Sequence, residues 1–211
     1  MEQASAAVQG ILAKGHFRTT YKLAVLHAIL DILACAPECV EIVDVRDIAV
    51  RVTCLYWPHV RPYATKRGPR FLRQDELLRD PAQSTILSAI QAYWTTIGLQ
   101  LKAGEGPQHL VDSYERLVDQ VESTLREDPL WRLQVVDGST EPGIYLETGR
   151  AEMRTTKNLH LVPGVYTVLS ADADTLREKV QVRWTRFVAR RNGIGLSETA
   201  IGDLRRFLFP L

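Results

Sequence analysis

The sequence is short of cysteine and of net charge. Its three cysteines, Cys35, Cys39 and Cys54, are odd in number and lie close together. This usage is typical of free thiols in a reducing compartment and not of a disulfide framework, so we expect a cytoplasmic protein. The formal net charge is only +1, which argues against a general polyanion binder and requires any electrostatic binding surface to be regional.

Long apolar runs are also missing. No uninterrupted apolar run reaches the length of a membrane span, and the N-terminal residues place an acid before the first base without a long apolar core. A transmembrane segment and a secretory signal are therefore not expected, and we expect no membrane partner. The length of 211 residues suffices to bury a real hydrophobic core.

Recognisable catalytic motifs are absent as well. The sequence has no glycine-rich phosphate loop, no dinucleotide-binding glycine pattern and no Gly-x-Ser-x-Gly elbow, and its five histidines are scattered. We therefore expect no catalytic residue, no bound metal and no cofactor within this chain. One alternative stays open, a stand-alone metal-dependent nuclease using Asp137, Glu147 and Glu152, because phosphodiester cleavage by metal ions needs converging carboxylates.

The strongest positive signal is a stretch without acid. Residues 48–74 contain no Asp or Glu, yet they carry six cations and four aromatic residues. This mixture is typical of a surface that meets phosphates and stacked bases, although a solvated loop whose aromatic side chains pack back onto the core also fits. The residues are Arg51, Arg61, Lys66, Arg67, Arg70 and Arg73, with Tyr56, Trp57, Tyr63 and Phe71.

Hydrophobic periodicity predicts an α+β fold that is predominantly α-helical. Helices are expected over residues 21–34, 45–56 (capped by Asp44), 83–102, 109–126, 174–191 and 199–209, and short strands over 131–135, 144–146 and 158–162. The architecture would be a helical bundle with a small β-sheet inserted before a long C-terminal helix. Residues 1–127 would form a helical region with a basic loop at 58–73, and residues 128–211 the sheet and long helix, in one compact unit.

The helix expected at 109–126 has an acidic face. Asp112, Glu115, Asp119 and Glu122 lie on the side opposite its apolar residues. Such a face is either solvated or in contact with the acid-free stretch at residues 48–74, which we call the basic segment. The pattern leaves both alternatives open.

Four segments taken in order carry a resemblance to a known family: TYKLAVLHAILDI, IAVRVTCLYWPHVRPY, DPLWRLQ and LHLVPGVYTVLSADADTLREKVQVRWTRFVARRN. Their succession resembles the N-terminal, non-catalytic region of bacterial HNH endonuclease-domain proteins, over roughly residues 17–208. The resemblance implies a following catalytic module with a Cys-x-x-Cys pair and a histidine-containing divalent-metal site. This chain ends at Leu211 without counterparts of those residues, which leaves open a truncated gene product, a piece of a longer nuclease and a stand-alone relative.

The leading hypothesis is a DNA-binding or target-positioning region of an HNH-type endonuclease, in restriction or defence. In it the arginines contact phosphates, and Tyr63 or Trp57 stacks on or wedges between bases, unless Tyr56 and Trp57 pack inside. The alternative is a protein-interaction module, a sensor or inhibitor, whose basic loop meets an acidic protein surface. The predicted nucleic-acid contacts are Arg61, Tyr63, Lys66, Arg67, Arg70, Arg73, Arg190 and Arg191.

Overall fold

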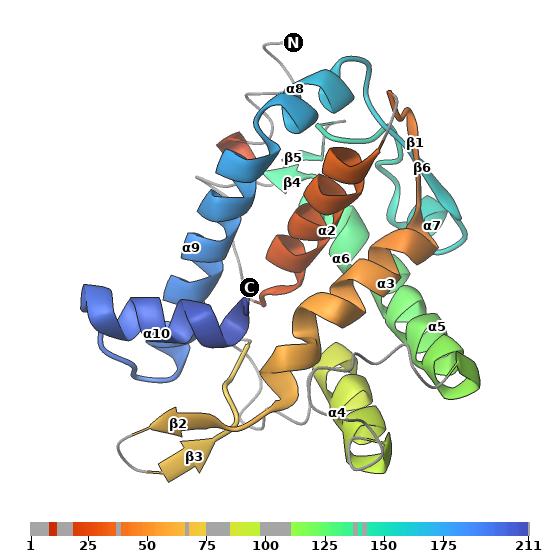
Figure 1. Cartoon of the computed structure of the whole chain (residues 1–211). Coiled ribbons are helices and arrows are strands. Elements are labelled where there is room, and N and C mark those ends of the chain that lie inside the picture. The colour runs from red at the N-terminus through yellow and green to blue at the C-terminus, as the bar shows by residue number, and fades with distance from the viewer. Residues whose placement is uncertain are drawn as a thin grey trace.

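The fold is built around one buried helix, α2 (Tyr21–Cys35), shown in Figure 1. The computed structural model describes residues 9–11, 19–36, 39–65, 68–74, 85–97, 111–136, 139–140 and 143–210. Every residue of α2 from Lys22 to Leu30 is buried, as expected for a helix whose apolar residues occupy nearly its whole circumference. At the start of α2, Thr19 Oγ1 accepts from the backbone nitrogen of Tyr21 at 3.3 Å, whereas the Thr20 side chain makes no cap hydrogen bond and instead contacts Tyr56 and Gln74 in the core.

The second helix, α3 (Val45–Tyr56), begins where the sequence predicted. Asp44 caps it, since its Oδ1 accepts from the backbone nitrogen of Arg46 at 2.7 Å. Its apolar stripe packs against α2 and against α5 (Val111–Glu127). α4 (Thr85–Ile97) packs against α5 in turn and completes this side of the molecule. The prolines after α3 end it in a short 3₁₀ turn, η1 (Trp57–Val60).

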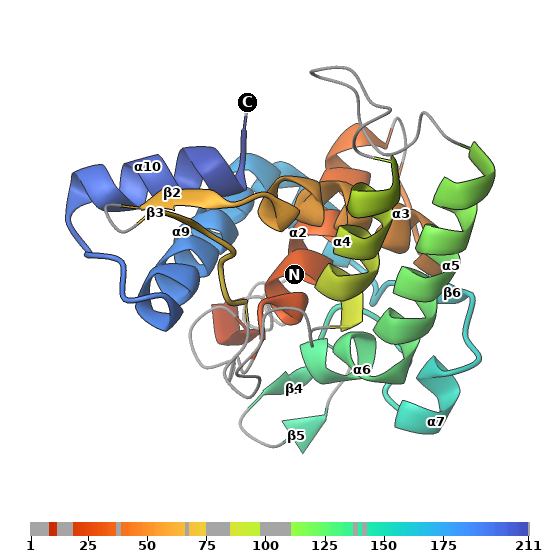
Figure 2. The same ribbon diagram turned by 90° about the horizontal axis from the view of Figure 1, so that it is seen from below.

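The C-terminal part contains α8 (Val165–Ala171), the long α9 (Ala173–Arg191) and α10 (Glu198–Leu208). α9 packs along α2 and meets α10, as Figures 1 and 2 both show. Gly193, with a positive φ of 60°, follows the residue that ends α9 and suits that helix end. α8, where no helix was expected, begins directly after Gly164.

The predicted α+β, predominantly α-helical fold with little β-structure is confirmed. Its β-structure consists, among the described residues, of three separate two-stranded antiparallel pairs rather than a single sheet. The expected strand at 144–146 is reduced to a single bridge between Tyr145 and Leu161. The pairs are β1 (Ile42–Asp44) with β6 (Asn158–His160), β2 (Tyr63–Thr65) with β3 (Gly68–Arg70), and β4 (Val135–Val136) with β5 (Ser139–Thr140).

The strand predicted at 131–135 is wrong for most of its length, because residues 129–133 form a helical turn, α6 (Pro129–Leu133). Pro129 suits the first turn of a helix, and Arg132 pairs with Asp128 four residues earlier. Leu130 and Leu133, three residues apart, are both buried. A second short helix, α7 (Arg150–Met153), follows the β4–β5 pair.

One hydrophobic core joins the two regions expected at 1–127 and 128–211. α2 from the first region packs against α6, α8 and α9 from the second, and β1 pairs with β6 across the boundary. None of the helices within the described ranges is long and apolar enough to cross a lipid bilayer.

Candidate nucleic-acid interface

The basic segment is more ordered than the loop expected at 58–73. After η1 it forms the β2–β3 pair, in which Tyr63 lies opposite Arg70 and Thr65 opposite Gly68. Gly68 has a φ of 103°, a conformation that favours glycine, and Thr65 Oγ1 donates to its carbonyl oxygen at 2.7 Å. The pair lies beside α10 and the C-terminal end of α9 (Figure 2), and the ring of Tyr63 contacts Phe207 of α10 edge-on at 5.0 Å between centroids.

Asn192, the residue that ends α9, fastens the basic segment to that helix. Its Oδ1 accepts from the backbone nitrogen of Arg73 at 2.9 Å, and its Nδ2 donates to the carbonyl oxygens of Arg73 at 3.0 Å and Val188 at 2.8 Å. The guanidinium of Arg70 donates to the backbone carbonyl oxygen of Asn192. Both amide donors of Asn192 are therefore occupied, and its side chain serves to hold the segment in place.

The two chain segments enclose a surface hollow of about 430 Å³, which we call the basic hollow. Arg70, Phe71, Arg73, Arg191 and Asn192 line it. Three of these five side chains are guanidinium groups, and no carboxylate is among the described residues that line the hollow. The structure thus brings together three of the predicted residues, Arg70, Arg73 and Arg191, across a sequence separation of about 120 residues.

The end of α9 supplies more positive charge than the sequence reasoning recognised. Residues 179–197 form a second acid-free stretch, in which Arg183 and Arg186 lie on the helix face that also carries Arg190. Burial and the neighbouring Arg190 lower the pKa of Arg183, the direction expected where cations crowd. Counting carboxylates along the whole chain would have revealed this stretch, whereas attention to arginines alone identified only Arg190 and Arg191.

A purely structural role explains only part of this charge. The C-terminal end of a helix carries about half a negative charge, which favours nearby cations such as Arg70, Arg190 and Arg191. Three guanidinium groups at the basic hollow exceed that half charge several-fold. Arg70 uses one bond to Asn192, and a guanidinium has five N–H donors. Arg70 and Arg73 are exposed, so positive charge and N–H donors of these two side chains face solvent at the basic hollow.

The other predicted nucleic-acid contacts lie in different environments. Arg61 and Arg190 are exposed, and neither has an ion pair with another described residue. Tyr63 is half-buried against Phe207, and burial and the Asp203 carboxylate raise its pKa, so that the phenol stays neutral at neutral pH. Lys66 and Arg67 lie outside the described residues.

The aromatic residues at the start of the basic segment point inward. Tyr56 is fully buried, and Trp57 is 6% exposed and packs edge-on against Tyr93. Trp57 therefore cannot stack on a base without leaving the core, which resolves the alternative that the sequence left open. Phe71, in contrast, is 42% exposed and lines the basic hollow.

A buried hydrogen-bond network centres on Gln74, directly after the Arg73 of the basic hollow, and no sequence pattern singled this residue out. Gln74 Oε1 accepts from Thr20 Oγ1 at 3.0 Å and from Trp184 Nε1 at 2.8 Å. Gln74 Nε2 donates to His59 Nδ1 at 3.0 Å, and His59 Nε2 donates to the carbonyl oxygen of Leu208 at 2.8 Å. The network thereby ties the end of the basic segment to α2, α9 and α10, and burial lowers the pKa of His59 to about 4.

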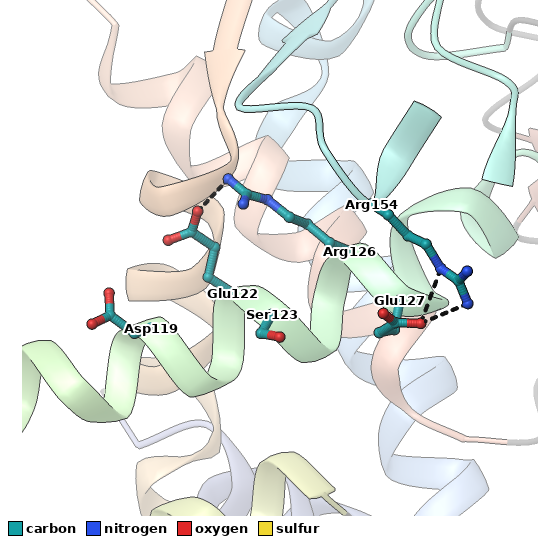
Figure 3. Close-up of a pocket in the computed structure, with 6 residues that line it drawn as sticks. All are labelled: Asp119, Glu122, Ser123, Arg126, Glu127 and Arg154. Atoms are coloured by element: carbon teal, nitrogen blue, oxygen red, sulfur yellow. Dashed lines mark hydrogen bonds and ion pairs between the residues drawn. The ribbon is translucent and has the colours of Figure 1, made fainter. Parts of the chain in front are cut away.

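A second hollow, of about 270 Å³, lies on α5 and is shown in Figure 3. Its charged side chains are already paired: Arg126 with Glu122, and Arg154 Nη2 with Glu127 at 2.9 Å. Arg46 of α3 pairs with Glu115, Asp119 and Glu122. The acidic face of α5 therefore makes its complementary contact with α3 and not with the basic segment, and most of its charge is compensated internally.

The carboxylates considered for metal-dependent cleavage have other partners. Glu147 is buried and accepts from His160 Nδ1 at 2.5 Å, while Glu152 accepts from the backbone nitrogen of Gly149 at 3.4 Å. Asp137 lies outside the described residues. Within the part of the chain that the structure describes, no group of three or more His, Cys, Asp or Glu side chains is placed to hold a metal ion.

Comparison with known proteins adds no relative. No protein-family model matches the chain, and no curated protein and no solved structure matches it either. Support for the candidate interface therefore comes from the geometry of the basic hollow, and the similarity to HNH-associated regions stays a prediction.

Proposed function

We propose that this chain binds DNA through the basic hollow and acts as the target-positioning region of an HNH-type endonuclease in restriction or defence. The convergence of Arg70, Arg73 and Arg191 from two acid-free segments into one hollow carries this proposal. Arginine forms paired hydrogen bonds with phosphate oxygens, and clustered arginines release counterions from DNA when they bind.

The described geometry favours contact with the DNA backbone. Arg61 and Arg190 are exposed and would extend the positive surface on either side of the basic hollow. Phosphate contacts fix the position and orientation of a protein on DNA without specifying sequence. Phosphodiester cleavage is assigned to the HNH module that the resemblance implies, together with its divalent metal, and the role proposed for this chain is to hold the target.

The test is binding of the full chain to a fluorescent blunt DNA duplex, measured by anisotropy at several salt concentrations. We expect affinity to fall by at least tenfold between roughly 50 and 200 mM salt, because each neutralised phosphate adds close to one unit to the salt slope. Arg73→Glu should weaken binding by about tenfold, which corresponds to about 1.4 kcal/mol. Only its backbone holds Asn192, so the fold should survive this substitution.

Lys157→Glu is the matched control, since Lys157 is exposed and directly precedes β6. Figure 1 shows β6 far from the β2–β3 pair and from the end of α9 that meets α10. It makes the same change in net charge and should alter the affinity less than twofold. Affinity that does not change with salt, or an equal loss in both variants, would contradict the proposal. Binding to poly-glutamate but not to DNA would instead favour the protein-interaction alternative.

A further inference from the structure

Phe71 is an unusual residue to leave in solvent. The large apolar side chains found exposed among the described residues are Ile42, Phe71, Leu146 and Leu196, of which Phe71 alone is aromatic. Solitary exposed apolar side chains are ordinary, but this ring lines a hollow together with three guanidinium groups. The exposure of this ring beside guanidinium groups therefore points to a ligand.

The direction of Phe71 is fixed by alternation along residues 71–74. Leu72 and Gln74 are buried at 2% and 1% exposure, whereas Phe71 and Arg73 are exposed. The alternating burial places Phe71 and Arg73 on the exposed side of this segment, and both side chains line the basic hollow.

This combination is what an unpaired nucleotide requires. Base stacking on an aromatic side chain, with cations tracking the phosphates, is the general mode of single-strand binding. In a continuous duplex the bases are 3.4 Å apart and already stacked, so that no base face is available to Phe71. The ring can contribute only where a base is unpaired.

The volume and the polar groups of the hollow agree with this occupant. At about 430 Å³ the basic hollow falls within the range of about 300–1,000 Å³ that is typical of small-ligand sites. The Asn192 amide, the one uncharged polar side chain of the lining, has both donors engaged with the backbone. A bound base would be held chiefly by stacking, and the Asn192 amide donors would make no hydrogen bond that selects its identity.

We propose that the basic hollow binds an unpaired nucleotide of DNA, with its base stacked on Phe71 and its phosphate held by Arg73 and Arg191. This inference rests on the proposed DNA-binding function and specifies the substrate class. Single strands, gaps and frayed ends would bind more tightly than continuous duplex, with little preference for base.

The experiment compares a single-stranded oligothymidine with a blunt duplex of equal length, using anisotropy with the full chain. Because a stacked base loses its platform, Phe71→Ala should weaken single-strand binding by roughly tenfold and duplex binding by less than twofold. Phe71→Leu, which keeps apolar bulk but has no flat face, should behave like Phe71→Ala. Phe71→Trp should retain wild-type affinity.

A second measurement locates the contact directly. Oligothymidine carrying 5-iodouracil should crosslink to Phe71 on irradiation, as identified by mass spectrometry, and thermal unfolding should show that the Phe71 variants remain folded. Salt-dependent duplex binding that Arg73→Glu weakens, together with unchanged single-strand affinity in Phe71→Ala, would overturn this inference and leave the proposed function standing. If the chain binds neither the oligothymidine nor the duplex, both this inference and the proposed function are overturned.

Discussion

Two charged surfaces of this molecule differ in how their charges are balanced. On α5, Glu115, Asp119 and Glu122 are paired with Arg46 of α3, and Arg126 and Arg154 take the carboxylates nearby. At the end of α9 the basic hollow gathers three guanidinium groups with no carboxylate among its described lining residues. A charged surface that neutralises itself keeps little charge for a partner, whereas exposed guanidinium groups such as those of Arg70 and Arg73 are available to a ligand of opposite charge.

The two surfaces also differ in what holds them. Ion pairs between side chains that are largely exposed link α5 to α3, and such pairs contribute little to stability. The segment that carries Arg70 and Arg73 is held in place by the buried hydrogen bonds of Gln74 and by those of Asn192. The comparison therefore predicts large effects on stability beneath the basic hollow and small ones at α5.

The largest expected effect follows Gln74→Leu. The substitution leaves the Trp184 Nε1 donor and the His59 Nδ1 acceptor without partners in the core, whereas the Thr20 hydroxyl keeps its hydrogen bond with the Tyr56 hydroxyl at 2.6 Å. Each unsatisfied buried group costs about 1–3 kcal/mol, so we expect a loss of about 4 kcal/mol in the free energy of unfolding. Urea denaturation measures it, with Gln120→Leu on the exposed face of α5 as the control. Equal stability of the two variants would show that the network does not support the segment.

A somewhat smaller effect should appear as acid destabilisation through His59. Its pKa of about 4 in the folded chain lies below the ordinary 6.5, so between these values the unfolded chain binds a proton that the folded chain does not. Stability should therefore fall as the pH drops from about 6.5 to about 4, by about 3 kcal/mol in total, and change no further from this group below that. The quantity to measure is the difference in urea unfolding between wild type and His59→Gln at each pH. The wild type should lose more, and parallel curves would exclude His59 as the cause.

The smallest expected effect is that of Arg46→Gln. The substitution removes the partner of three carboxylates, but the Arg46 side chain is 37% exposed and Glu122 keeps Arg126. We expect a loss of about 1 kcal/mol or less at low salt, decreasing at high salt as the charges are screened. Thermal unfolding at two salt concentrations checks this. A loss of stability as large as that of Gln74→Leu would show that the ion pairs on α5 matter as much for stability as the buried network around Gln74.

The sequence predicted the long elements well, for a physical reason. α2, α3 and α9 carry apolar patterns over 12 or more residues, together with end signals such as Asp44 and Gly193, and such patterns discriminate helix from strand. α6 has only five residues, in which alternation of Trp131, Leu133 and Val135 fits a strand as well as the i, i+3 spacing fits a helix. Local contacts, the proline and the Arg132–Asp128 pair, decided in favour of the helix.

The candidate site was predictable in its residues but not in its geometry. The acid-free stretch at 48–74 indicated the arginines, and Arg70, Arg73 and Arg191 do line one hollow. Their meeting depends on Asn192 and Gln74, whose partners lie 119 and 110 residues away in sequence. Hydrogen bonds over such distances leave no periodic trace in a single sequence. For the same reason the burial of Trp57 against Tyr93 of α4 was open until the packing was known.

The most direct test of DNA binding at the basic hollow is the salt dependence of duplex binding in two variants with the same chemical change, Arg73→Gln and Arg46→Gln. A guanidinium that contacts phosphate adds close to one unit to the slope of log affinity against log salt. We predict that Arg73→Gln lowers the magnitude of the wild-type slope by about one, whereas Arg46→Gln leaves it unchanged. Equal slopes in wild type and Arg73→Gln would contradict the assignment of DNA binding to this surface.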